Sequence, residues 1–191
     1  MKPGTRAIGV AESYRGRAPD AESTLAATVV RADRAVDGVA LGRCTVGGTD
    51  ATDAVVSLLT RLDRPDARYL LLAGVAPAWY NLLDLHEIHA TADRPVLSVS
   101  FEESPGLAAA LSREFDGDAL DARLAIYERQ PPRAPVAVGE DTVWVRSVGV
   151  DDASARDVVR GFTPEGGRPE PVRIARLVAR AADRFRRTTD G

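Results

Sequence analysis

Apolar and β-branched residues in the first quarter of the chain occur in short runs separated by turn sequences. These runs, rich in Val, Ala, Leu and Thr, predict three strands at residues 6–13, 23–32 and 36–46. Short connections separate the three runs, and such connections join antiparallel neighbours. The pattern therefore predicts an antiparallel meander.

The rest of the chain alternates between strand and helix patterns. Continuous apolar runs at residues 69–76 and 94–102 are typical of strands buried on both faces, and residues 142–150 predict a further strand. Helical patterns cover residues 50–62, 78–93, 106–115, 119–129, 152–162 and 171–187.

The order of these elements predicts the fold class. Three antiparallel strands followed by alternating helices and strands is how the ribonuclease H-like fold begins, an α/β fold with a mixed sheet and helices on both faces. Pro131, Pro132 and Pro135 indicate a rigid loop before the last strand.

The strand at residues 69–76 ends where an α/β sheet usually gathers its ligands and catalytic groups. Its tip carries Ala73 and Gly74, which supply no acid, base or nucleophile. The nearest polar residues are Asn81, Asp84 and Glu87, whose spacing places them roughly on one face of the following predicted helix.

Composition bounds the class of protein. A length of 191 residues with 45% apolar and 28% charged residues predicts one globular domain over residues 1–191 with frayed termini. The apolar runs are far shorter than a membrane span, and the first residues lack the pattern of a secretory leader. We therefore expect a cytoplasmic protein without a membrane partner.

The net charge of −3 predicts no strong general attraction to nucleic acid, so binding would need a local basic surface. The last predicted helix offers such a surface, because arginines recur at helical spacing opposite its apolar positions. They could neutralise several phosphates, or form a solvated face that suits a helix C-terminus. This stripe consists of Arg173, Arg176, Arg180, Arg184 and Arg187.

Other reactive groups have a structural interpretation that we favour. Asp151 and Asp152 stand where a helix begins, so capping explains them better than a magnesium site. His86 and His89 lack the spacing of a zinc motif. Cys44 lies within a predicted strand, which indicates a small buried residue and not a nucleophile.

Four sequence blocks resemble the archaeal deoxyuridine-specific endonuclease family, a formerly uncharacterised family related to endonuclease V. The blocks are G-V-A-E-S-Y at 9–14, V-G-G-T-D-A-T at 46–52, L-L-A-G-V-A-P-A-W-Y-N-L-L-D-L at 71–85 and P-E-P-V-R at 169–173. The resemblance covers nearly the whole chain. It implies a single endonuclease V-like domain that nicks DNA next to deoxyuridine with a divalent metal, in repair of deaminated cytosine.

This chain departs from the family pattern at two acidic positions. The pattern has G-I-D-D on the first strand and L-D-G on the fourth, whereas this chain has Ala11 and Ala73 in place of one aspartate in each. Metal-assisted cleavage of a phosphodiester needs carboxylates that hold the ion, and alanine supplies no ligand atom. We therefore expect a catalytically weakened or inactive member.

The resemblance also implies roles for the polar residues that remain. Glu12 and Asp84 could serve as catalytic residues that hold one Mg²⁺ or Mn²⁺ ion, if the extra methylene of Glu12 compensates for Ala11. The alternatives are a weak one-metal nuclease, a protein that kept the fold and lost the chemistry, and a non-catalytic nucleic-acid-binding or assembly module. A further alternative is a protein that binds a small ligand through Asn81 and Asp84. Candidate contacts to DNA are Asp50, Asn81, Glu170, Arg173, Arg176 and Arg180.

Overall fold

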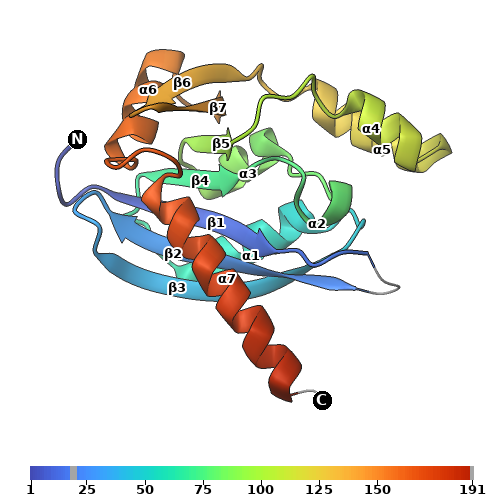
Figure 1. Ribbon diagram of the computed structural model, residues 1–191, viewed down its shortest axis with the longest axis horizontal. Helices are drawn as coiled ribbons and strands as arrows, with labels where there is room; N and C mark the ends of the chain where they lie inside the picture. The colour runs from blue at the N-terminus through green and yellow to red at the C-terminus, as the bar shows by residue number, and fades with distance from the viewer. Residues whose placement is uncertain (18–20, 190–191) are drawn as a thin grey trace.

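The computed structural model describes residues 1–17 and 21–189, and its strands form one mixed sheet (Figure 1). The strands are β1 (Arg6–Ser13), β2 (Glu22–Arg31), β3 (Val36–Thr45), β4 (Tyr69–Ala73), β5 (Val96–Ser100), β6 (Ala134–Val138) and β7 (Asp141–Val148). Their order across the sheet is β3-β2-β1-β4-β5-β7-β6. The first three strands pair antiparallel, β1, β4 and β5 pair parallel, and β7 pairs antiparallel with β5 and β6. The predicted meander and mixed sheet are confirmed.

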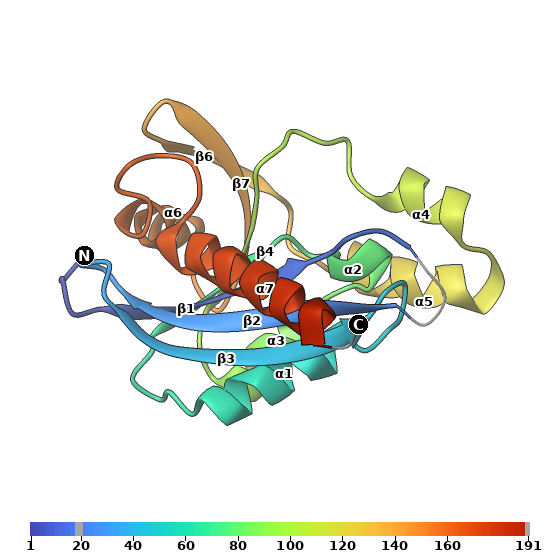
Figure 2. The ribbon, with the colours of Figure 1, turned by 60° about the horizontal axis from the view of Figure 1, so that its bottom comes forward.

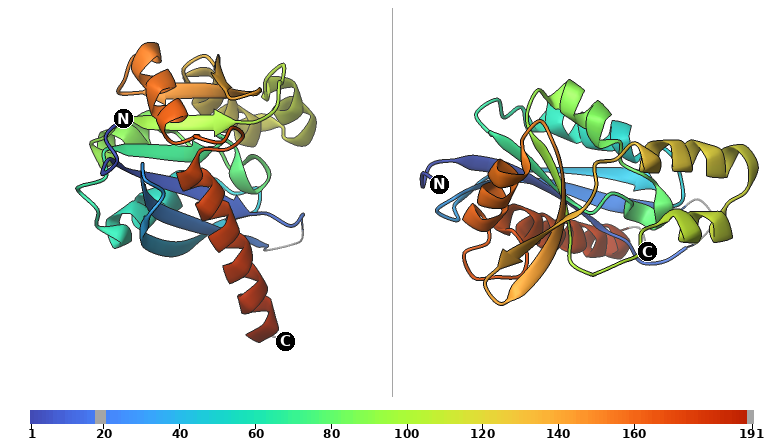
Figure 3. Two further views of the ribbon diagram at one scale, coloured as in Figure 1. Left: turned by 60° about the vertical axis from the view of Figure 1, so that its left-hand side comes forward. Right: turned by 90° about the horizontal axis from the view of Figure 1, so that it is seen from above.

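Helices cover both faces of the sheet. They are α1 (Ala51–Leu62), α2 (Pro77–Tyr80), α3 (Leu85–Ala92), α4 (Ala108–Glu114), α5 (Gly117–Glu128), α6 (Asp152–Gly161) and α7 (Glu170–Thr189). One apolar core lies under α1 and α3, and a second lies under α6 and α7 on the opposite face (Figure 2). The pair α4 and α5 protrudes beyond the end of the sheet (Figure 3). No helix within the described ranges is long and apolar enough to cross a membrane.

Helix α7 packs closely against β1 and β2 because β1 carries a glycine at the crossing point (Figure 1). A Cβ atom on Gly9 would lie 2.0 Å from the carbonyl carbon of Pro171, so a larger residue cannot fit unless the helix moves. The hydroxyl of Thr28, opposite Gly9 on β2, donates to the carbonyl oxygen of Pro171 at 2.9 Å. These contacts fix the first turn of α7 on the sheet.

The predicted loop before β7 is present at residues 131–133, but its extension to Pro135 was wrong. Residues 134–138 form β6, which pairs with β7 at the edge of the sheet. An edge strand tolerates Pro135, because half of its backbone N–H groups have no partner strand. Val136 and Val138 point inward and are buried. With only these two inward-facing apolar residues, the strand pattern of β6 was too short to outweigh the prolines in the sequence.

The helix predicted over residues 78–93 was wrong in its first part. Ala78, Trp79 and Tyr80 have φ angles of 48°, 56° and 61°, so this turn is left-handed. The right-handed helix α3 begins after Asp84, which is its N-cap residue. Asn81 and Asp84 precede α3, and therefore do not share a helical face with Glu87 as expected.

Candidate functional site

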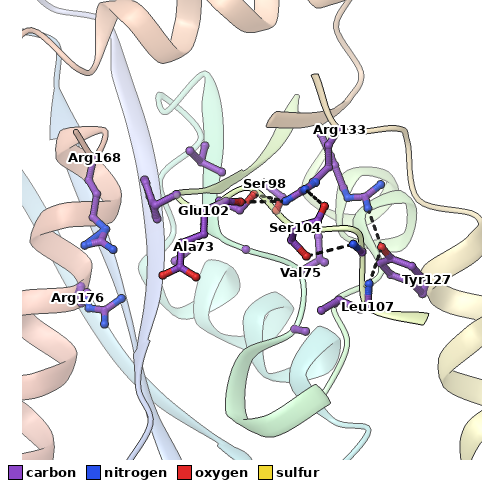
Figure 4. Close-up of a pocket in the computed structure, with 17 residues that line it drawn as sticks. Ala73, Val75, Ser98, Glu102, Ser104, Leu107, Tyr127, Arg133, Arg168 and Arg176 are labelled. Atoms are coloured by element: carbon purple, nitrogen blue, oxygen red, sulfur yellow. Dashed lines mark hydrogen bonds between the residues drawn. The ribbon is translucent and has the colours of Figure 1, made fainter. Parts of the chain in front are cut away.

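A cavity of about 410 Å³ lies at the carboxyl ends of β4 and β5 (Figure 4). Ala73, the last residue of β4, belongs to its lining. Arg168 and Arg176 approach from the side of α7, and Arg133 and Tyr127 lie on the opposite side. The volume falls within the range of small-ligand pockets, so this end of the sheet is the candidate functional site.

Side-chain alternation along β1 and β4 decides which residues face α7 and the cavity. Val10 packs in the core under α1 and α3, whereas Ala73 packs with the core under α6 and α7. Because alternate residues point to opposite faces, Ala11 faces the α7 side and Glu12 faces the α1 side. The pairing of Val10 with Leu72 places Ala11 beside Ala73. The two alanines therefore share one face, and Glu12 lies on the other.

Glu12 is hydrogen-bonded on its own side of the sheet. Its Oε2 atom accepts from the Ser23 hydroxyl at 2.6 Å and from the backbone N–H of Ala78 at 2.8 Å. Burial raises the pKa of the Glu12 carboxyl, and these hydrogen bonds and the charge of Arg176 offset that rise only in part. Glu12 thus ties β1 to β2 and to the left-handed turn. Its catalytic and metal-binding roles stay predictions.

Asp84 is almost fully buried at the start of α3. Its Oδ1 atom accepts from the backbone N–H groups of His86 at 3.1 Å and Glu87 at 3.2 Å, and its Oδ2 atom pairs with Arg129. Both carboxylate oxygens therefore have partners within the protein. Asp84 does not belong to the cavity lining, and its metal-binding role stays a prediction.

Asn81 and Asp50 connect the start of α1 to the segment before α3. The buried Asn81 side chain accepts from the Ala51 N–H at 2.9 Å and donates to the Thr45 carbonyl at 2.8 Å and to Asp50 at 2.6 Å. Burial by itself would raise the pKa of Asp50, but hydrogen bonds from Asn81 and Thr45 outweigh it, so the pKa is lowered. Asp50 occupies the N-cap position of α1 without a side-chain capping bond. The predicted contacts of both residues with DNA are untested.

The predicted DNA-contacting residues at the start of α7 differ in whether their charges are paired within the protein. Glu170 and Arg173 form a two-bond ion pair at 2.7 and 2.8 Å, so each charge already has a partner. Arg176 lines the cavity, and Arg180 is exposed one turn further along the helix. Of the arginine stripe, Arg176 is the member that reaches this site.

Three arginines of the cavity were missed by the sequence reasoning. Arg133 precedes β6, Arg146 lies on β7 and Arg168 precedes α7. No spacing pattern connects residues from such distant segments, and Arg146 on a strand of alternating character gives no signal by itself. Glu102 is the one carboxylate among the described lining residues. The cavity is therefore strongly cationic.

The residues around the cavity do not fit a divalent metal ion. Mg²⁺ needs oxygen ligands in near-ideal positions, and the methyl groups of Ala11 and Ala73 offer none. Within residues 1–17 and 21–189, no three His, Cys, Asp or Glu side chains come together as metal ligands. The arginines near Glu102 would in addition repel a cation.

Solved structures share this architecture. A protein of unknown function from Archaeoglobus fulgidus is 24% identical with a TM-score of 0.80, over 93% of this chain and 98% of that protein. An endonuclease V of Ciona intestinalis, in complex with DNA that contains an inosine, is 12% identical with a TM-score of 0.62, over 95% of this chain and 87% of its own. Similarity to endonuclease V structures confirms the predicted ribonuclease H-like, endonuclease V-like fold.

Sequence comparison identifies the family. A UPF0215 protein of Pyrobaculum calidifontis is 32% identical over 173 residues, which cover 90% of this chain and 93% of that protein. The sequence model described as endonuclease dU matches residues 3–183. The chain therefore belongs to the endonuclease dU family.

Proposed function

We propose that this chain binds DNA at the cationic cavity and does not cleave it. One observation carries this proposal: Ala11 and Ala73 present methyl groups on the α7 face of the sheet, while Glu12 is turned to the other face. Metal-assisted hydrolysis depends on carboxylates that hold the ion against the phosphate. A member of the family with alanine at both positions keeps the fold but lacks the carboxylate ligands that would hold a catalytic metal ion.

The charge around the cavity supports nucleic acid as the ligand. Arg168 and Arg176 line the cavity, and Arg180 extends the basic surface along α7. Arginine contacts to phosphates supply much of the affinity of nucleic-acid-binding proteins and make it depend on salt. The family resemblance implies deoxyuridine-containing DNA as the first probe, and a cytoplasmic role in DNA repair belongs to the same proposal.

The test combines a cleavage assay with a binding assay on the full chain. A uracil-containing duplex and a matched thymine duplex are incubated with Mg²⁺ or Mn²⁺, and binding is followed by fluorescence anisotropy in a chelator at increasing salt. We expect no nicks, and binding that survives the chelator and falls steeply with salt. Nicking of the uracil strand that disappears in Glu12→Gln or Asp84→Asn would contradict the proposal and support a weak one-metal nuclease.

Two single-charge variants test the location of the binding surface. Arg176→Gln removes a charge at the cavity, and Arg61→Gln removes an exposed charge from α1 on the opposite face. A phosphate contact contributes about one unit to the slope of log affinity against log salt. We expect that decrease for Arg176→Gln and an unchanged slope for Arg61→Gln. Equal effects of the two variants would contradict binding at the cavity.

A further inference from the structure

The cavity contains an unbalanced group of positive charges. Arg133, Arg146, Arg168 and Arg176 line it, and Glu102 is the one carboxylate among the described lining residues. Like charges around a partly buried space repel one another, and an anion that enters relieves this repulsion. The arrangement therefore favours an anionic ligand.

Arg168 and Arg176 have the least internal compensation of this group. Among the described residues, the side chains of both arginines form no hydrogen bond and no ion pair. The Arg168 guanidinium lies 4.2 Å from the ring centroid of Phe101, and its Nε atom is buried without a hydrogen-bond partner. Burial lowers the pKa of Arg176, the charges of Arg180 and Arg168 lower it further, and the charge of Glu12 offsets this lowering only in part. Because a guanidinium group carries several N–H donors, the donors of both arginines that lack a partner among the described residues are available to a ligand.

The opposite side of the cavity is held by internal contacts. Arg133 donates to the carbonyl oxygen of Ser104 at 2.6 Å, and Arg146 donates to the carbonyl oxygen of Pro131. Arg146 is only 9% exposed, and its Nε atom has no hydrogen-bond partner in the part of the chain that the structure describes. This side of the cavity is therefore held in a fixed shape, and the buried Nε–H of Arg146 remains there as a hydrogen-bond donor without an acceptor among the described residues.

We propose that Arg168 and Arg176 form a metal-independent site for the terminal phosphate group of a nucleotide. The inference rests on the proposed binding of nucleic acid and names the chemical group that enters the cavity. That group is a phosphomonoester, carried either by the end of a strand or by a free nucleotide. Planar guanidinium groups match pairs of phosphate oxygens, which makes arginine well suited to this ligand. Ala73 leaves space beside the arginines where a carboxylate would compete with the phosphate.

Charge favours a phosphomonoester over an internal phosphodiester. A monoester carries about −1.5 to −2 charges at neutral pH, whereas each internal phosphodiester carries a single charge. Among the described residues neither Arg168 nor Arg176 has a direct ion-pair partner, so the two arginines together match the larger charge. Ser98 and Ser104 line the same cavity, and their hydroxyl groups can donate further hydrogen bonds to phosphate oxygens.

Isothermal titration calorimetry tests the site. The full chain is titrated with thymidine 5′-monophosphate, thymidine and inorganic phosphate in the presence of a chelator. We expect the monophosphate to bind and thymidine not to bind. Arg168→Gln and Arg176→Gln should each weaken binding at least about tenfold, because each removes a charge-assisted contact. The matched variant Arg61→Gln should leave binding unchanged. Equal binding of thymidine and its monophosphate, or an equal loss in Arg61→Gln, would overturn the inference.

Ala73→Asp provides a second test that keeps every arginine. Its carboxylate would stand in the cavity near Arg168 and Arg176, and should abolish binding of the monophosphate through electrostatic competition. Thermal unfolding of each variant shows whether it is folded. Undiminished binding to folded Ala73→Asp would contradict the proposed location.

Short oligothymidylates with a 5′-phosphate, a 3′-phosphate or no terminal phosphate separate the two sources of the group. Preference for one phosphorylated end identifies a strand terminus as the ligand. Binding of the mononucleotide without binding of any oligonucleotide identifies a free nucleotide, and contradicts the proposed binding of DNA. Equal binding of all three oligonucleotides without binding of the mononucleotide overturns the terminal-phosphate site and leaves the proposed function standing.

Discussion

Ala11 and Glu12 are consecutive residues of β1, and their side chains lie on opposite faces of the sheet. Ala11 faces α7, whereas Glu12 accepts hydrogen bonds from Ser23 and from the backbone of Ala78. Because the side-chain period of a strand is two, a longer side chain at position 12 does not occupy the space of a carboxylate at position 11. This geometry argues against compensation for Ala11 by the extra methylene of Glu12.

Restoring the two missing acids should create a cation site. In Ala11→Asp/Ala73→Asp, two neighbouring carboxylates would face α7, and such oxygens are the ligands that Mg²⁺ and Mn²⁺ prefer. We expect calorimetry to detect Mn²⁺ binding by this variant and none by the wild-type chain. The pair Ala11→Asn/Ala73→Asn has a similar shape without the charges and serves as the control. Mn²⁺ binding by the wild-type chain that is lost in Glu12→Gln would contradict the assignment of faces.

The raised pKa of Glu12 makes stability depend on pH. The folded chain holds this proton more tightly than the unfolded chain does, so the contribution of the protonated carboxyl is complete below the ordinary value of 4.5. That contribution is lost as the pH rises through the raised folded-state pKa. Glu12→Gln carries a neutral amide throughout, so the free energy of unfolding of the wild type should fall relative to this variant over that window. Chemical denaturation at several pH values measures the difference, and a constant difference would contradict the raised pKa of Glu12.

Local patterns of sequence predicted most of the sheet and the cap of α6. Alternation and apolar runs identified β1 to β5 and β7, and Asp151 caps α6 by accepting from the backbone of Ser154 at 2.7 Å. Cys44 is buried as expected, and burial raises the pKa of its thiol to about 12. These features depend on residues close in sequence, which explains why they could be predicted.

The left-handed turn could not be predicted, because distant residues hold it in place. Left-handed backbone costs roughly 1–2 kcal/mol per residue for ordinary side chains, and Ala78 and Trp79 are not residue types that favour it. The carbonyl of Ala78 accepts from the Gly47 N–H at 2.7 Å, and the carbonyl of Tyr80 accepts from Arg123 at 3.2 Å. The cavity arginines were missed for a related reason, since the fold brings them together from separate segments.

Asp84 should contribute to stability mainly as the cap of α3. Asp84→Ala removes the acceptor for two backbone N–H groups, and loss of an N-cap costs about 0.5–2 kcal/mol. Asp84→Asn keeps a capping oxygen and removes the charge that pairs with the half-exposed Arg129. We therefore expect a smaller loss for the asparagine variant in chemical denaturation. Equal losses would show that the ion pair, and not the cap, carries the contribution.

The crossing of α7 over β1 should tolerate no side chain at Gly9. In Gly9→Ala the added Cβ would meet the backbone of Pro171 at 2.0 Å, so α7 has to move away from the sheet. Overpacking of this kind costs about 1–3 kcal/mol, and each kcal/mol lowers the melting temperature of a chain of this size by roughly 2–4 °C. Gly4→Ala is the matched control, because no atom lies within 4 Å of its added Cβ.

Since Arg176 is carried by α7, the same displacement of α7 should weaken nucleotide binding in Gly9→Ala and leave it intact in Gly4→Ala. Unchanged stability and binding in Gly9→Ala would mean that α7 can shift on the sheet without cost, and that the position of Arg176 does not depend on this contact.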